Sequence, residues 1–391
     1  KYEARKADFE KENFKIMSSG NFLCKMNNGT WAFKKKSEMI TTYEHLSVKV
    51  VKENKKPKET EIEDKCFVNM WLKDINMKRY DDVDVFPPPI KCPPNMFNLW
   101  TPFRGELLFK KGYTERKWAI DMVEKHMLIM CDGDMDVYNY LRLWIGQMLK
   151  YPAIKTNVPI FTGLQGGGKS SIFNILTAIL GEDKCVETTS PDEDIWGKYN
   201  GIVANSFLVV INELEKKQMM NSLGKIKGLI TDTALTINKK GVPQYQINSY
   251  HRFGMTTNKE DPFETSKDDR RAWIVRVSDE LIDNKPYFND LYDMLKHDDC
   301  IATLYDYFYN LDGVDNFNNI PKPETDYQKT LVDINTDIVD GIVNQAYVYW
   351  NVSDKTTLTF GRWNTFLGYE VIAPAGNFNY SCSYLFSSGP F

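Results

Sequence analysis

The sequence predicts an α/β fold whose core is a mostly parallel, helix-covered β-sheet between about residues 150 and 280. Short apolar runs, which are typical of buried strands, alternate there with stretches of helical periodicity. A glycine-rich segment joins the first apolar run to a helix, and polar residues directly follow two later runs. Because parallel strands end at the same edge of a sheet, we expect these polar residues to gather at that edge.

Two short apolar runs, Val158–Thr162 and Phe207–Ile211, are predicted strands of this sheet, and Arg252–Thr256 and Trp273–Val277 are expected to be further strands. Apolar residues at helical spacing predict two helices, Val137–Met148 and Ser170–Leu180. Two further runs, Leu235–Asn238 and Gln244–Ile247, flank a Lys-Lys-Gly-Val-Pro segment. This order of strand, turn residues and strand predicts a β-hairpin.

Four regions are expected along the chain: an N-terminal segment with a charged linker (1–65), a mainly helical domain (66–150), the domain that holds the sheet (151–283) and a C-terminal region (284–391). The charged linker is Lys52–Glu61, and a helix is expected over Phe67–Tyr80. The C-terminal region is rich in Tyr, Phe and Asn, and we find no motif in it that indicates a chemistry.

Composition excludes a membrane span and a secreted, disulfide-linked scaffold. Hydrophobic residues make up 42% and charged residues 26% of the chain, with no long uninterrupted apolar run. Lys1–Glu10 is too charged for a signal peptide, and a chain that opens on Lys1 rather than Met leaves room for upstream domains. The net charge of −4 means that any nucleic-acid binding depends on local Lys and Arg placement.

The cysteines indicate a reducing, intracellular compartment. There are seven, widely scattered and without a C-x-x-C pair: Cys24, Cys66, Cys92, Cys131, Cys185, Cys300 and Cys382. An odd and scattered set is atypical of a disulfide framework and of a structural zinc site.

The most specific motif lies between the first predicted strand and the helix after it: Gly163, Leu164, Gln165, Gly166, Gly167, Gly168, Lys169 and Ser170. It fits G-x-x-x-x-G-K-[ST], in which glycines let backbone N–H groups face phosphate oxygens and the helix adds its positive N-terminal end. Lys169 would reach the β- and γ-phosphates, and the Ser170 hydroxyl would ligate Mg²⁺. With Ser171, this segment predicts a site for ATP and Mg²⁺.

Polar residues at two strand ends complete this prediction. Phe207–Ile211 runs into Asn212 and Glu213, and Glu213 is expected to orient and deprotonate the attacking water. Asn212 stands where an aspartate is usual, so its expected contact with the metal shell would add no charge. Arg252–Thr256 leads to Asn258, whose amide can bond the γ-phosphate or the water.

Two basic pairs are candidates for phosphate contacts outside the loop. Arg270 and Arg271 follow two aspartates just before the last predicted strand. Such a turn is usually a salt-bridged surface feature, but in a ring ATPase it can reach a neighbour's γ-phosphate. Lys239 and Lys240 lie at the expected hairpin tip, where they can pair with nucleic-acid phosphates; the alternative is a solvated turn.

Together, these motifs resemble those of the superfamily 3 helicases of DNA viruses and related mobile elements, most of all the poxvirus and giant-virus type of primase-helicase. The likeness spans about Trp71 to Val277. It implies an AAA+ fold, a homo-hexameric ring, ATP with Mg²⁺, and 3′ to 5′ translocation on single-stranded and forked DNA. It also allows for a primase domain upstream or in trans, and for the host cytoplasm, the nucleus or a viral replication site as location.

The resemblance also gives roles to single residues. Gly163, Gly166, Gly168, Lys169 and Ser170 would cradle phosphate, while Asn212 and Glu213 would form the Walker B pair. Asn258 would be the sensor, and Lys239 and Lys240 would grip the DNA backbone in the central channel. The arginine finger falls on Arg270 or Arg271, which the spacing does not separate.

Three other functions fit parts of the pattern. A ring ATPase for replication initiation or DNA packaging would share every motif but would not unwind a fork. A small-molecule kinase would use the glycine-rich loop but has no evident use for the Lys and Arg pairs. A catalytically silent oligomeric scaffold would account for Asn212.

Overall fold

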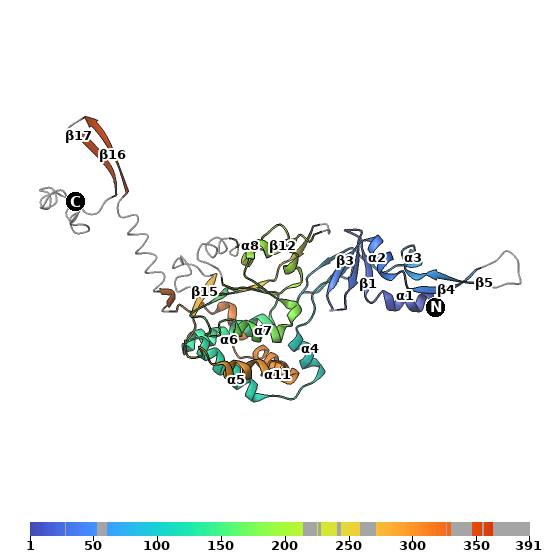
Figure 1. The fold of residues 1–391 in the computed structure, drawn as a ribbon, viewed down its shortest axis with the longest axis horizontal. Coiled ribbons are helices and arrows are strands. Elements are labelled where there is room, and N and C mark those ends of the chain that lie inside the picture. The colour runs from blue at the N-terminus through green and yellow to red at the C-terminus, as the bar shows by residue number, and fades with distance from the viewer. Residues whose placement is uncertain are drawn as a thin grey trace. The chain divides into compact units, whose positions relative to one another are not determined.

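The computed structural model describes residues 1–27, 29–52, 61–213, 225, 228–240, 244–258, 271–325, 327–329, 346–353 and 356–362. The chain forms two compact units. The first holds residues 1–262 and 270–325, and the second holds residues 263–269 and 326–391. In the second unit the described strands are β16 (Ala346–Ser353) and β17 (Thr356–Arg362), an antiparallel hairpin (Figure 1).

The core of the first unit is a five-stranded sheet in the order β10-β11-β14-β9-β15, and every neighbouring pair is parallel. Its strands are β9 (Val158–Thr162), β10 (Cys185–Thr188), β11 (Leu208–Ile211), β14 (Arg252–Thr257) and β15 (Ala272–Arg276). The predicted α/β core is therefore confirmed, with four of its strands at nearly the expected bounds. All residues of β9, β11 and β14 are buried; β9 and β11 accordingly read as apolar runs, whereas β14 also buries Arg252 and two threonines.

The order of the strands reverses the direction of the connections between β9 and β14. From β9 the chain passes through α7 (Ser171–Leu180) to β10 at the far edge, then returns through β11 to β14. It next crosses to β15 on the other side of β9. The connections that leave β9 and β14 thus run in opposite directions, and the carboxyl ends of such neighbouring strands are where open α/β sheets bind ligands.

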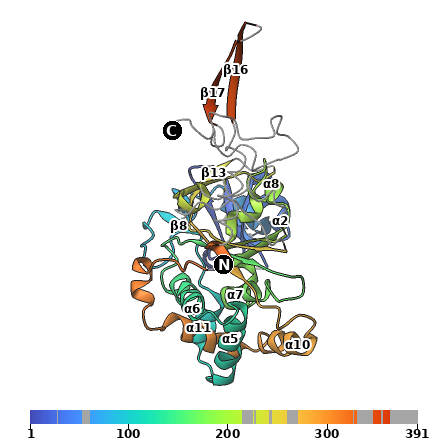
Figure 2. The ribbon, with the colours of Figure 1, turned by 90° about the vertical axis from the view of Figure 1, so that its left-hand side faces the viewer.

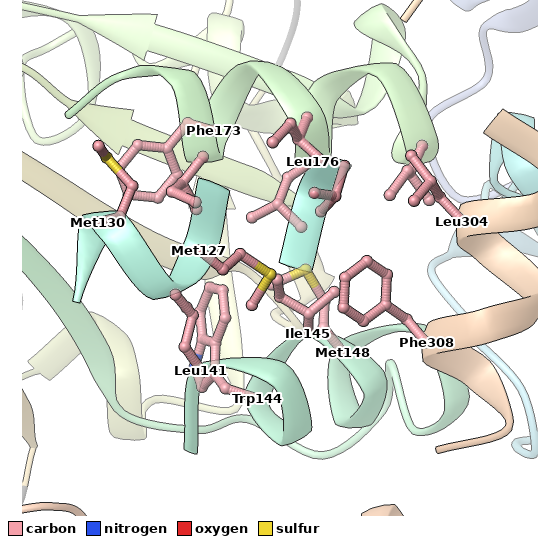
Figure 3. Close-up of a cluster of buried hydrophobic side chains, with 14 of the residues drawn as sticks. Met127, Met130, Leu141, Trp144, Ile145, Met148, Phe173, Leu176, Leu304 and Phe308 are labelled. Carbon is pink, nitrogen blue, oxygen red and sulfur yellow. The ribbon is translucent and has the colours of Figure 1, made fainter. Parts of the chain in front are cut away.

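Helices from both ends of the first unit share one hydrophobic core with this sheet. They are α4 (Arg104–Lys111), α5 (Lys117–Met130), α6 (Met135–Lys150), α7 and α11 (Asp298–Tyr309), and α11 contacts each of the other four. Figure 3 shows the central side chains, among them Trp144 of α6, Phe173 of α7 and Phe308 of α11, each fully buried. A side chain of this size contributes about 1.5–3 kcal/mol when buried.

The remaining elements of the region after Arg104 are short. They are the 3₁₀ helices η1 (Glu182–Lys184), η2 (Gly201–Asn205) and η3 (Val314–Asn319), α8 (Pro191–Asp194) and α10 (Lys285–Met294). Strands β12 (Ala234–Ile237) and β13 (Tyr245–Asn248) pair antiparallel, so the predicted hairpin is confirmed (Figure 2). Helix α10 and helix α11 belong to the same unit as the sheet, so that unit continues past the boundary expected at residue 283.

Helices α4, α5 and α6 occupy most of residues 104–150, and the part of the chain before them mixes helices and strands. It contains α1 (Tyr2–Phe9), β1 (Asn13–Ile16), β2 (Phe22–Lys25), β3 (Trp31–Lys34), α2 (Lys36–Tyr43), β4 (Ser47–Lys52), β5 (Glu61–Cys66), α3 (Phe67–Trp71), β6 (Arg79–Tyr80), β7 (Asp82–Asp84) and β8 (Met96–Asn98). The helix expected over Phe67–Tyr80 is wrong beyond α3. The helix ends early for a local reason. Asp74 Oδ1 accepts a hydrogen bond from Asn76 N at 2.8 Å, and this turn competes with a helical backbone.

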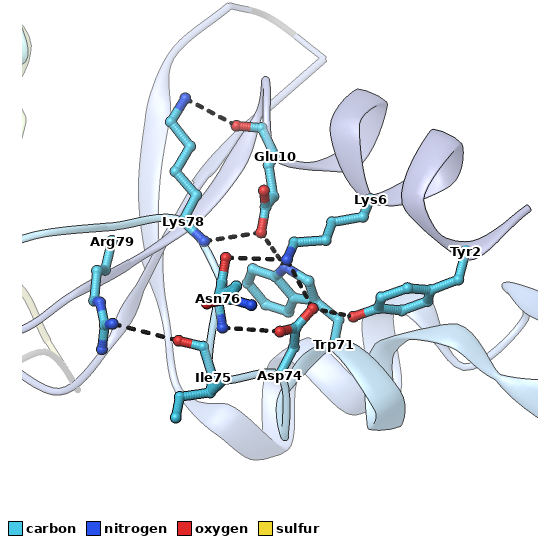
Figure 4. A network of polar contacts seen from close by, with 9 residues as sticks. All are labelled: Tyr2, Lys6, Glu10, Trp71, Asp74, Ile75, Asn76, Lys78 and Arg79. Carbon is cyan, nitrogen blue, oxygen red and sulfur yellow. Dashed lines mark hydrogen bonds and ion pairs between the residues drawn. The ribbon is translucent and has the colours of Figure 1, made fainter.

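Packing also crosses the boundary expected at residue 65. Tyr2 Oη and Lys6 Nζ both donate to Asp74 Oδ2, at 2.8 and 2.7 Å, and Trp71 Nε1 donates to Glu10 Oε1 at 2.8 Å (Figure 4). The hydrogen bond from Lys6 is the main reason that the pKa of Asp74 falls to about 2. Most of the expected linker lies outside the described residues, but the strands on either side of it, β4 and β5, pair with each other.

Two sequence expectations concern the whole chain. No helix among the described residues has the length and apolarity that a bilayer crossing requires. Cys24, Cys66, Cys92, Cys131, Cys185 and Cys300 are free thiols, while Cys382 lies outside the described part.

Candidate functional site

The strand register brings the predicted site residues to one edge of the sheet. Ile160 of β9 and Ile211 of β11 both pair with Met255 of β14, so the three strands end almost level. The glycine-rich loop, Glu213 and Asn258 follow these strands directly. The loop, Glu213 and Asn258 therefore all lie at the carboxyl edge of the sheet.

The glycine-rich loop adopts a backbone that most side chains disfavour. Gly166 has φ +86° and Gly168 has φ +88°, both in the left-handed region. A Cβ on Gly168 would also lie 2.7 Å from the ring of Phe288 in α10, which is too close for any real contact. The motif's glycine at this position is therefore required both by the turn and by a helix that the sequence did not connect with it.

Lys169 is buried at the centre of the loop, with 8% of its surface exposed. Its Nζ donates to the carbonyl oxygens of Gly163 at 2.8 Å and Leu164 at 2.7 Å. Burial lowers the pKa of Lys169, while the carboxylates of Glu213 and Asp279 act to raise it. A cation, two carboxylates and a curled backbone thus meet at one place.

Ser170 and Ser171 differ in their surroundings although they are adjacent. Ser170 precedes α7 and is exposed, so its hydroxyl is accessible to a cation or a phosphate. Ser171 is buried, and its Oγ lies 2.6 Å from His126 Nε2 of α5. No group of three His, Cys, Asp or Glu side chains in the described residues is arranged as a metal site, so a cation here would need Ser170 and ligand oxygens.

Asn212 is engaged at both ends of its amide. Its Oδ1 accepts from Thr256 Oγ1 at 2.8 Å, and its Nδ2 donates to Glu187 Oε2 at 3.1 Å. These bonds join the ends of β10, β11 and β14. A carbonyl oxygen has a second lone pair, so Oδ1 can still accept a bond from a metal-bound water.

Glu213 is exposed and has a left-handed backbone, with φ +57°. Few residues other than glycine adopt this conformation, and such residues cluster at functional sites. Its backbone N donates to Thr256 O at 3.0 Å, which fixes the start of this turn against β14. Asn258, at the end of β14, is also exposed at this edge.

The two hairpin lysines differ in burial. Lys239 is partly buried, because its aliphatic stem packs against Gly201, where an added Cβ would lie 2.6 Å from Lys239 Cγ. Burial also lowers the pKa of Lys239. Lys240 is exposed. The rest of the tip, residues 241–243, lies outside the described residues.

Arg271 lies at the opposite edge of the sheet from the glycine-rich loop. Its carbonyl oxygen accepts from Val158 N at 2.8 Å, and β15 then runs alongside β9 so that Arg276 pairs with Thr162. Arg270 lies outside the described residues. The candidate arginine that can be placed is therefore remote from the loop of its own chain.

Sequence reasoning missed the residues that pack against the loop from elsewhere in the chain. They are Phe288 of α10, which lies against Gly168, Asp279 after β15, which acts on Lys169, and His126 of α5, which contacts Ser171 just after the loop and is itself bonded to Tyr287 of α10. None of them belongs to a motif, and each is more than thirty positions from the loop. Only their three-dimensional contacts identify them.

Known proteins match this chain in part. A model of a family of unknown function (DUF5906) matches residues 161–271, and a model described as an OmpL-like porin (BBP2) matches residues 311–391. The DNA primase-polymerase of Nitratiruptor phage NrS-1 is 24% identical over 175 residues, which cover 44% of this chain and 24% of that protein. The chain thus matches about a quarter of the length of that relative.

Solved structures extend this match to the fold. The apo structure of the NrS-1 C-terminal region has a TM-score of 0.63 and 18% identity, and the match covers 85% of this chain and 75% of that one. The structure titled SCCmec type IV Cch, active helicase, has a TM-score of 0.38 at 10% identity, too low to carry an argument. The chain is therefore homologous to part of a phage primase-polymerase and shares the fold of its C-terminal region.

Proposed function

We propose that the chain is the ATPase part of a replicative DNA helicase of the superfamily 3, AAA+ type, which works as a homo-hexameric ring with a 3′ to 5′ polarity. The observation that carries this proposal is the meeting of the glycine-rich loop, buried Lys169 and Glu213 at the carboxyl edge of the sheet. Homology to part of a DNA primase-polymerase supports a role in DNA replication.

In this proposal the loop binds the phosphates of ATP. Lys169 exchanges its bonds to the Gly163 and Leu164 carbonyls for bonds to the β- and γ-phosphates. Ser170 holds Mg²⁺, which when bound neutralises charge on the phosphate oxygens, and Asn212 accepts from a water of its shell. Because Ser170 is exposed next to the loop's backbone N–H groups, Ser170 and the loop fit Mg²⁺ bound together with a nucleotide phosphate.

The remaining residues act on the attacking water and detect which nucleotide is bound. Glu213 orients the attacking water and takes its proton, and Asn258 bonds the γ-phosphate or that water. An arginine from the neighbouring subunit, Arg270 or Arg271, faces the developing charge. Hydrolysis would move the hairpin that carries Lys240 along single-stranded DNA.

The test is ATP turnover with and without single-stranded DNA, strand displacement on a forked duplex, and mass measurement with nucleotide bound. We expect DNA-stimulated turnover and unwinding by a ring, both lost in Lys169→Ala. Turnover without strand displacement would instead favour a motor for initiation or packaging. Absence of any turnover would favour the silent scaffold and overturn the proposal.

A further inference from the structure

Three side chains form a chain of hydrogen bonds that ends on the glycine-rich loop. Tyr287 Oη lies 3.1 Å from His126 Nδ1, and His126 Nε2 lies 2.6 Å from Ser171 Oγ. Ser171 Oγ in turn donates to the carbonyl oxygen of Gly168. The members come from α10, α5 and α7, so three separate helices meet at this loop.

The protonation states give this chain a single direction. His126 is fully buried, and burial lowers its pKa to about 4, so its ring is neutral and carries one N–H. The one proton of the Ser171 hydroxyl goes to Gly168, so Ser171 Oγ accepts from His126 Nε2–H. Nδ1 then holds a lone pair, which accepts a hydrogen bond from Tyr287 Oη–H. Burial raises the pKa of Tyr287 to about 12, so this hydroxyl stays protonated.

The end of the chain fixes one peptide group. The Gly168 carbonyl oxygen accepts from Ser171 N at 2.8 Å as well as from Ser171 Oγ. A trans peptide is planar, so a carbonyl held toward α7 directs the N–H of Lys169 the opposite way. Hydrogen bonds in a row polarise one another, so this N–H also becomes a better donor.

Resting on the nucleotide site proposed above, we propose that His126 is a positioning residue, which holds the Gly168–Lys169 peptide in the orientation that binds a nucleotide phosphate. Tyr287 selects the ring tautomer that lets His126 do so. The tautomer of a histidine is commonly fixed in this way by the partner of its other nitrogen. Without Tyr287, Nδ1 could carry the proton and Nε2 would compete with Gly168 for the Ser171 hydroxyl.

The test measures phosphate affinity in the full chain with two probes, a fluorescent ADP analogue and inorganic tripolyphosphate as its competitor. His126→Leu and Ser171→Ala should each weaken both probes about three- to tenfold, the loss of roughly one hydrogen bond. His126→Gln, which retains an N–H near the position of Nε2, should stay within about twofold of the wild type. The double variant, His126→Leu with Ser171→Ala, should bind no more weakly than the weaker of the two single variants, because each change breaks the same row of hydrogen bonds.

A matched control is His251→Leu. His251 is also buried, with Nδ1 against Ser249 Oγ and Nε2 against Val203 O, but it precedes β14 at the opposite edge of the sheet. Melting temperatures will show which variants fold, and His251→Leu should not change either affinity. If His126→Leu does not fold, Ser171→Ala, His126→Gln and Tyr287→Phe still test the chain.

Nitrogen NMR of labelled histidine provides a readout that a packing role would not move. The chain has four histidines, so the His126 signals can be assigned by comparison with His126→Gln. We expect the Nε2–H tautomer in the wild type and a shift toward Nδ1–H in Tyr287→Phe. Unchanged affinities in folded His126→Leu and Ser171→Ala, or an Nδ1–H wild type, would overturn the inference. A wild type that binds neither probe would overturn the proposed function, and the inference with it.

Discussion

Arg270 and Arg271 offer the strongest test of a shared active site, because the place of Arg271 in the sheet is remote from the loop of its own chain. Arg271 immediately precedes β15, whereas the glycine-rich loop follows the other end of β9, beside Arg276. Five strand residues span about 16 Å, more than an extended arginine side chain and one hydrogen bond can bridge together. If this arginine contacts a γ-phosphate, that phosphate belongs to a neighbouring subunit.

The perturbation is Arg270→Ala or Arg271→Ala, each made separately. One of them should bind ATP as the wild type does but lose about 10³–10⁵ in turnover, the usual contribution of an arginine finger. Steady-state turnover and binding of a fluorescent ATP analogue measure the two effects. The other arginine serves as the matched control, because it removes the same charge from the same turn.

Mixing provides the decisive measurement. In a ring assembled from equal amounts of the inactive arginine variant and Lys169→Ala, about a quarter of the head-to-tail interfaces join an intact loop to an intact finger. Turnover should therefore recover to about a quarter of the wild-type rate if interfaces act independently. Failure to recover in mixtures shown to co-assemble would refute the shared site. A dilute monomer that is active at full rate would refute the ring.

Three further predictions address the proposed water, metal and DNA contacts. Glu213→Gln should bind ATP normally and lose about 10²–10⁴ in turnover, and wild-type turnover would remove Glu213 from its role. Asn212→Asp places a second carboxylate beside Glu187, so the variant should melt at a lower temperature than the wild type without Mg²⁺. The added negative charge should also lower the Mg²⁺ concentration needed for half-maximal turnover. An unchanged Mg²⁺ titration would mean that position 212 is structural. Lys240→Ala should make the salt dependence of single-stranded DNA binding shallower by about 0.7 in the log–log slope, whereas Lys239→Ala should change it less; equal effects would contradict the separation seen in burial.

The sheet could be predicted from the sequence where burial leaves a continuous signal. Strands β9 and β11 are buried along their whole length, so each reads as an apolar run with bounds within a residue or two. Strand β10, Cys185–Thr188, was missed because it is a short edge strand that carries the exposed Glu187. The two-residue strand β6 could not be predicted, because it exists only through its pairing with β1, more than sixty positions earlier.

The site divides in the same way. The positions of the loop glycines, Lys169 and Glu213 could be predicted because each follows directly after a strand that the local sequence reveals. Contacts of the loop with His126 and Phe288 depend on how α5 and α10 pack, which no local pattern records. The unequal burial of Lys239 and Lys240 is likewise a tertiary effect, because the aliphatic part of the Lys239 side chain packs against Gly201.

Thr256 connects the proposed sensor to the proposed base. Its Oγ1 donates to Asn212 Oδ1, and its carbonyl oxygen accepts from Glu213 N, so both residues at the end of β11 are bonded to β14. Asn258 lies two residues after Thr256, directly past the end of β14. A pull on Asn258 by a γ-phosphate would therefore be transmitted to Glu213 through the backbone of a buried strand rather than through a mobile loop. The left-handed conformation of Glu213 fits such a role, because a strained residue persists only where its neighbours hold it, and here β14 is one of them.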